Sequence, residues 1–223
     1  MILQHKKFYK LLGLYFALFL ISQLVICLFA QNDFSVWEIS VNMDKLIIYI
    51  LIPLFLCGSS IIDQSITKTV VVRMGSRKKA LRFEMKQQYL FAAIFFIAWT
   101  LLIFLFTAVL FDFSFLREDW LEVLNLYSRV FLGSCLLLNC AAILRKEKHF
   151  NIAMAAYPLA YLLLLLEVMA IRPAMEMVGQ GMEVNLFFSW IFYDGALAFF
   201  VLAFWLSISC ILLEHMATKE DIF

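Results

Sequence analysis

Long apolar runs dominate this sequence and constrain what the chain can fold into. Each run approaches the roughly 20 residues that a helix needs to cross the hydrocarbon core of a bilayer. The runs are too long and too continuous for the alternating strands of a barrel, so helices are the remaining way to cross. With 65% hydrophobic and only 16% charged residues, the chain also lacks the polar surface of a soluble domain. We therefore expect an all-α integral membrane protein.

Six runs qualify as transmembrane helices of a single domain covering residues 1–223. The first run follows a basic stretch, but it is too long for the apolar region of a signal peptide and lacks a small-residue cleavage site, so we keep it as a span. The second run is short and contains Pro53 and Gly58. The six predicted spans cover residues 8–30, 46–62, 89–111, 126–144, 150–171 and 195–213.

The distribution of basic residues predicts how the spans are oriented. An even number of spans puts both termini on one side of the membrane. Most of the 18 Lys and Arg residues lie in the N-terminal tail, in the loops after the second and fourth spans, and in the C-terminal tail. The other side carries most of the acidic loop residues. The positive-inside rule therefore predicts that both termini are cytoplasmic.

The segment 70–91 is the most basic part of the chain and is predicted to be cytoplasmic. Gly75 permits a sharp turn, and Ser76 is a good N-cap residue. Residues at intervals of four then form one apolar helical stripe, made of Leu81, Met85 and Tyr89. We expect a helix that starts at Ser76 and runs directly into the third span. Two roles remain open for its basic residues, namely orienting the protein on anionic lipids and docking a cytoplasmic partner.

Motifs for catalysis and for cofactor binding are missing from the sequence. There is no G-x-x-x-x-G-K-[ST] for nucleotide phosphates, and there is no H-E-x-x-H, G-x-S-x-G or C-x-x-C. The histidines and cysteines have no metal-ligand spacing. We therefore expect no catalytic residue, no metal site and no cofactor in this chain. Nucleic acid is not an expected partner, because the basic patch is short and lies against the bilayer.

A few polar residues inside the spans are candidates for function, since such residues are costly in hydrocarbon unless they are paired or hydrated. Glu167 and Arg129 are predicted to lie at similar depth near the outer side. We expect that they either pair or both reach the outer head groups, and an outer gate or substrate contact is a further hypothesis. Gln23 and Asn139 are expected to form interhelical hydrogen bonds. Asp194 is a further intramembrane polar candidate.

The layout resembles a known family of transport proteins. Six spans, cytoplasmic termini and the loop sequence RMGSRKKALRFEMKQQ resemble the permease subunits of ATP-binding-cassette exporters. The ending LLEHMATKEDIF is similar to the tails of small six-helix permeases from bacterial bacteriocin or lantibiotic export and immunity systems. The resemblance implies a cytoplasmic coupling helix that docks into a separate ATPase subunit. Carried over to this chain, the coupling residues are Arg73, Ser76, Arg77, Lys78, Lys79, Arg82 and Glu84.

The resemblance also implies an outer re-entrant hairpin before the last span. Residues 172–195 fit this hairpin, with Gly179 and Gly181 at its bend and Trp190 and Tyr193 at the membrane interface. The family usually has an amphipathic helix on the cytoplasmic surface before the first span. Here only the short stretch MILQHKKFYK precedes that span, so this chain departs from the family at that point.

Together these features predict the membrane-spanning subunit of an ATP-driven exporter in the bacterial cytoplasmic membrane. Its substrate would be amphipathic or peptide-like, as in antimicrobial-peptide export or immunity. Its partners would be a P-loop ATPase that binds ATP and Mg, and a second permease that is identical or similar. The alternative is a membrane sensor or accessory protein that transports nothing and docks a cytoplasmic partner through the basic loop. An intramembrane enzyme ranks last, because few ionisable residues lie at depth.

Overall fold

The computed structural model describes residues 47–74, 76–110, 114–146, 155–178, 186–193 and 195–220, together with the single positions 10, 13, 14, 17 and 21. These residues form helices and no strand, which confirms the all-α class for this part of the chain. The elements are η2 (Ile47–Leu51), α4 (Ile52–Met74), α5 (Arg77–Leu110), α6 (Ser114–Lys146), α7 (Ala156–Leu166), η4 (Glu167–Ile171), α8 (Arg172–Val178), η5 (Ser189–Ile191) and α9 (Ala196–Glu220). Of these, η2 and η4 are π-helices and η5 is a 3-10 turn.

Four helical stretches are long and apolar enough to cross a membrane, which is compatible with a multi-pass membrane protein. A fifth apolar stretch, Ile47–Asp63, is shorter. These five stretches correspond to the second to sixth predicted spans. The first predicted span, residues 8–30, lies outside the described residues apart from the five single positions. The four long stretches are Lys78–Leu105, Trp120–Arg145, Ala156–Ala174 and Ala196–Thr218.

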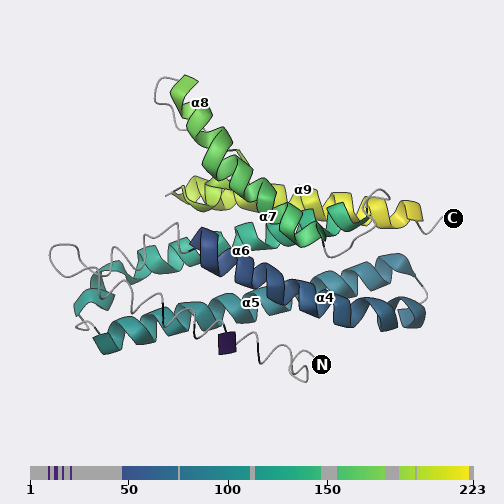
Figure 1. Ribbon diagram of the computed structural model, residues 1–223, viewed down its shortest axis with the longest axis horizontal. Coiled ribbons are helices and arrows are strands. Elements are labelled where there is room, and N and C mark those ends of the chain that lie inside the picture. Colours follow the sequence, from purple (N-terminus) through teal and green to yellow (C-terminus); the bar gives the residue numbers. More distant parts are fainter. Residues whose placement is uncertain are drawn as a thin grey trace.

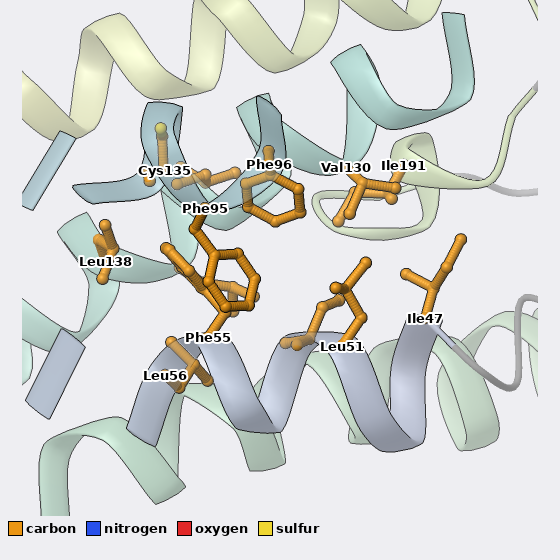
Figure 2. Packing of buried hydrophobic residues seen from close by; sticks show 14 of the residues in the cluster. Ile47, Leu51, Phe55, Leu56, Phe95, Phe96, Val130, Cys135, Leu138 and Ile191 are labelled. Carbon is orange, nitrogen blue, oxygen red and sulfur yellow. The ribbon is translucent and has the colours of Figure 1, made fainter. Parts of the chain in front are cut away.

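Helix α6 lies at the centre of the helical bundle. It packs against α5, α7 and α9, and it is the most buried of the membrane-length helices. The long helices run roughly side by side, while α8 points away from them (Figure 1). Figure 2 shows Phe55, Phe95 and Phe96 in the hydrophobic core among aliphatic side chains. Phe55 of α4 lies with its ring centroid 5.4 Å from Phe95 and 5.3 Å from Phe96 of α5.

The turn between α4 and α5 and the C-terminal ends of α6 and α9 lie at one end of the bundle, which we call the basic end. Helix α5 begins at Arg77, as the sequence predicts, and the Ala80 N–H donates to the Ser76 carbonyl over 3.1 Å. Helix α4 does not stop at the predicted boundary, residue 62, but continues to Met74. The described residues therefore contain no separate helix between α4 and α5. The predicted coupling residues belong to the end of α4 and the start of α5, and their coupling role stays a prediction.

Each π-helix ends two residues before a proline, Pro53 for η2 and Pro173 for η4. Proline has no N–H to donate to the carbonyl four residues earlier, so the regular α-helical ladder is interrupted there. Such interruptions are often accommodated by a wider π-turn. The two π-helices also contact each other, because the Tyr49 hydroxyl donates to the Met169 sulfur over 3.8 Å.

Candidate functional site

A buried ionic cluster at the basic end ties three helices together. Arg145, near the end of α6, donates hydrogen bonds to Asp63 of α4 and to Glu84 of α5. The side chains of Arg145, Asp63 and Glu84 are only 13%, 7% and 13% exposed. Removing one partner of such a buried pair leaves an uncompensated charge and is strongly destabilising. The cluster therefore fixes the base of the α4–α5 hairpin to the central helix.

A second group of polar side chains extends this cluster to α7. The Gln88 amide donates to the Ser59 carbonyl over 3.0 Å and to the Tyr157 hydroxyl over 3.4 Å. The Tyr157 side chain also forms a hydrogen bond with Asp63 of the cluster. Gln88, Ser59 and Tyr157 are all buried. Four helices, α4 to α7, are thus connected by polar contacts at one level of the bundle.

The cluster is suited to holding helices in place. Its single guanidinium lies between two carboxylates, and its other members are an amide, a backbone carbonyl and a phenol. Within the described ranges, no group of three or more His, Cys, Asp or Glu side chains could hold a metal ion. The physical consequence of the arrangement is mechanical, because a displacement of the α4–α5 hairpin acts directly on α6.

Among the predicted coupling residues, the structure separates the basic residues near the start of α5 from Glu84, which faces inward. Lys79 and Arg82 are exposed, whereas Ser76 and Lys78 are partly buried. Arg82 forms an ion pair with Glu214 of α9 at 2.8 Å. Glu84 faces inward to Arg145, so it belongs to the hairpin's base and not to an exposed docking surface. The side chains of two further predicted residues, Arg73 and Arg77, lie outside the described part of the structure.

At the opposite end of the bundle, Glu167 binds the segment 186–193 that precedes α9. Its carboxylate accepts hydrogen bonds from the Phe188 N–H at 2.8 Å, the Ser189 N–H at 2.9 Å and the Ser189 hydroxyl at 2.8 Å. These donors lie at the N-terminal end of the η5 turn, where a negative charge is favourable. Glu167 is 4% exposed, so the carboxylate serves as a buried cap for that turn.

Arg129 holds the other end of the same segment. Its guanidinium donates to the Tyr193 carbonyl, just after the η5 turn, and the residue is 4% exposed. Between the two charged residues, Ile191 is fully buried and packs closely on Gly133 of α6 (Figure 2 shows Ile191 beside Val130). A β-carbon added at Gly133 would lie 2.2 Å from the Ile191 Cδ1 atom. The segment 186–193 is thus inserted into the bundle.

This arrangement differs from both alternatives that the sequence suggests for Arg129 and Glu167. The two residues are buried, so they do not reach toward head groups, and among the described contacts Glu167 forms no ion pair with Arg129. Each residue instead binds one end of the segment 186–193. The reason is that the backbone of this segment offers N–H donors to Glu167 and a carbonyl acceptor to Arg129.

The other predicted outer residues are placed only in part. Trp190 and Tyr193 are partly buried, and their rings meet edge to face with centroids 5.1 Å apart. Gly179, Gly181 and Asp194 lie outside the described residues. The re-entrant hairpin therefore stays a prediction, although its second half, residues 186–193, does insert between helices.

Asn139 lies at the junction of three helices, where the sequence predicts an interhelical hydrogen bond. Its amide donates to the Ser209 hydroxyl of α9 over 2.7 Å, and its carbonyl oxygen accepts from the Tyr89 hydroxyl of α5 over 2.6 Å. Asn139 and Ser209 are buried. Gln23, which has the same predicted role, lies outside the described residues.

Sequence reasoning missed Asp63 and Arg145 as partners. A signal was present, because Asp63 directly follows the second predicted span and Arg145 directly follows the fourth. Two opposite charges at the same predicted membrane boundary are candidates for pairing. The resemblance places Glu84 in the coupling segment together with the basic residues. The sequence does not show that the Glu84 side chain faces Arg145 of α6.

No protein-family model matches this chain, and comparison with curated proteins and with solved structures finds no match either. The resemblance to exporter permeases is therefore an expectation from the sequence alone.

Proposed function

We propose that this chain is the membrane-spanning subunit of an ATP-driven exporter, and that the α4–α5 hairpin tip docks a separate P-loop ATPase. The observation that carries the proposal is the hairpin itself. Its last turns of α4, from residue 64 to Met74, and the first turns of α5 extend beyond the buried cluster at Asp63 and Glu84. The tip also holds the densest basic sequence of the chain, RKKALR. A helical projection with a basic sequence is suited to a complementary cleft on a partner.

The cluster around Arg145 supports a role for the tip in transmitting motion. An ATPase that pulls on the tip would act on α4 and α5, and the ion pairs of Arg145 would carry that displacement to α6. Helix α6 in turn packs against α7 and α9, so the central helix contacts much of the bundle. This chain would supply no ATP chemistry, and ATP and Mg would bind to the partner.

An apolar cavity supports an amphipathic or peptide-like substrate. It has a volume of about 620 Å³, lies between α5 and α6 with a contribution from α9, and opens onto the outer face of α5, where its lining residues Ile97 and Leu101 are exposed. Aromatic side chains provide much of its wall, and Thr100 and Ser128 are among its few polar residues. Such a cavity fits the apolar part of a ligand better than a charged group. Its aromatic lining includes Phe96, Phe104, Tyr127, Phe131 and Phe199.

Exposed apolar faces support a second permease subunit in the complex. On α5, residues at helical spacing point outward, and α9 has a similar outer face. In a membrane these faces contact either lipid or another permease. The outward residues of α5 are Leu90, Ile94, Ile97, Leu101 and Leu105.

Co-purification tests the docking proposal. We would express the chain with its candidate ATPase, extract the complex in mild detergent and compare wild type with Arg77→Glu, Lys78→Glu and Lys79→Glu combined. The matched control keeps the charge, as Arg77→Lys, Lys78→Arg and Lys79→Arg combined. We expect the ATPase to bind wild type and the control and to be lost from the charge-reversed variant. If no ATPase binds wild type, the accessory-protein alternative takes the place of the exporter.

A further inference from the structure

Helices α5 and α9 form a groove at the basic end that combines an apolar floor with a charged rim. The groove has a volume of about 330 Å³. It lies at the end of both membrane-length stretches, Lys78–Leu105 and Ala196–Thr218, where hydrocarbon would give way to head groups. Its lining residues are Leu81, Arg82, Met85, Lys86, Tyr89, Cys210, Leu213 and Glu214.

The floor of the groove is a small packed cluster. Leu81 and Leu213 are buried together with Ala142 and Ala217, and Met85 packs against them. The stripe of Leu81, Met85 and Tyr89, predicted from the sequence, is thus the face of α5 that lines this groove. The apolar floor is therefore lined by α5 and α9, and Ala142 of α6 belongs to the same buried cluster.

The rim of the groove carries more positive than negative charge. Arg82 and Lys86 are exposed and lie one turn apart on α5. Arg82 uses its Nε group for Glu214, and among the described residues no other atom accepts a hydrogen bond from its guanidinium. The lining of the groove therefore includes two cations, Arg82 and Lys86, and one carboxylate, Glu214, which binds only the Nε group of Arg82.

We propose that this groove binds one anionic phospholipid, with its phosphate at Arg82 and Lys86 and its acyl chain on Met85 and Leu213. Basic side chains at the membrane surface attract anionic lipids, and the guanidinium binds phosphate through several donors. The apolar floor then accepts the start of an acyl chain, which a soluble phosphate compound lacks. The groove shares Leu81 and Arg82 with the hairpin tip, whereas Arg77, Lys78 and Lys79, which the docking test changes, do not line it.

Native mass spectrometry of the detergent-purified full chain can count bound lipids. We would titrate phosphatidylglycerol and phosphatidylcholine with identical acyl chains. Wild type is expected to retain one phosphatidylglycerol much more tightly than phosphatidylcholine. Arg82→Gln combined with Lys86→Gln should weaken phosphatidylglycerol binding about thirtyfold, since each basic residue contributes about a fivefold preference. Lys79→Gln is the matched control, and it should bind phosphatidylglycerol like wild type.

Glu214→Gln gives a test of opposite sign. This variant removes the carboxylate that competes for Arg82, so phosphatidylglycerol should bind more tightly than to wild type. The proposal is overturned if the two lipids bind equally, if Arg82→Gln with Lys86→Gln binds like wild type, or if Glu214→Gln weakens binding. Displacement of the lipid by an equal concentration of inorganic phosphate would also overturn it, because the floor would then contribute nothing. The substituted side chains are exposed, and an unchanged melting temperature without lipid checks that each variant is folded.

Discussion

At the scale of single residues, the basic end depends most on Arg145. Its guanidinium lies between Asp63 and Glu84, and all three side chains are largely buried. Removing one member of a buried ion pair leaves uncompensated charge and costs about 3–5 kcal/mol. We expect Arg145→Met to lower the free energy of unfolding by about that amount, measured by denaturant titration in detergent micelles.

Two further variants separate the charge of Arg145 from its packing. Adding Asp63→Asn and Glu84→Gln to Arg145→Met neutralises both carboxylates and should recover much of the lost stability. Arg82→Met removes an ion pair whose arginine side chain is 61% exposed, so it should hardly change the unfolding curve. If Arg145→Met were as stable as wild type, the cluster would not hold the helices together.

Glu167 has an equally local role at the opposite end. In Glu167→Ala, the N–H groups of Phe188 and Ser189 lose their buried acceptor, and each unsatisfied group costs about 1–3 kcal/mol. We expect faster hydrogen exchange at the amides of the segment 186–193, measured by mass spectrometry. Leu166→Ala, at an exposed neighbouring position, should leave this exchange unchanged. Full protection in Glu167→Ala would show that the carboxylate does not hold the segment.

At the scale of elements, the contact between α6 and the η5 turn requires a glycine. Gly133→Ala would bring a methyl group into the Ile191 side chain, and overpacking of this kind costs about 1–3 kcal/mol. Ile191→Ala alone leaves a cavity and costs about 2–5 kcal/mol. Gly133→Ala combined with Ile191→Ala should lose less unfolding free energy than the sum of the two single losses. The shortened side chain at position 191 leaves room for the methyl group at position 133. A double-mutant cycle on unfolding free energies measures this coupling, and additive effects would contradict the contact.

Sequence patterns predicted where the helices lie better than they predicted where α4 ends and which groups Glu167 binds. The N-cap at Ser76 and the stripe at Leu81, Met85 and Tyr89 define α5 because helix periodicity is a local property. The end of α4 was missed, since the polar residues after Asp63 do not match a membrane span but still form helix. The partners of Glu167 were missed for a different reason. Apart from the Ser189 hydroxyl, they are backbone groups about 20 residues away, and backbone donors leave no trace in a sequence.

At the scale of the whole molecule, the number and direction of the spans determine which end meets the cytoplasm. Six spans with both termini inside predict that reporters at the N terminus, after residue 75, after residue 147 and at the C terminus all lie in the cytoplasm. Reporters after residues 112 and 181 should lie on the opposite side. Fusions to a periplasm-active phosphatase and a cytoplasm-active fluorescent protein measure this. A phosphatase active after residue 75 would reverse the predicted orientation.

The unbroken length of α5 has a mechanical consequence. It runs from Arg77 to Leu110, and Glu84 fastens it to Arg145 near one end. A stiff rod pinned there behaves as a lever with unequal arms. At a rise of 1.5 Å per residue, the arm toward Leu110 is roughly four times longer than the arm toward Arg77. In the proposed exporter, a push at the short arm would tilt the far end in the opposite direction, against the packing of Phe91, Phe95 and Trp99 in the core.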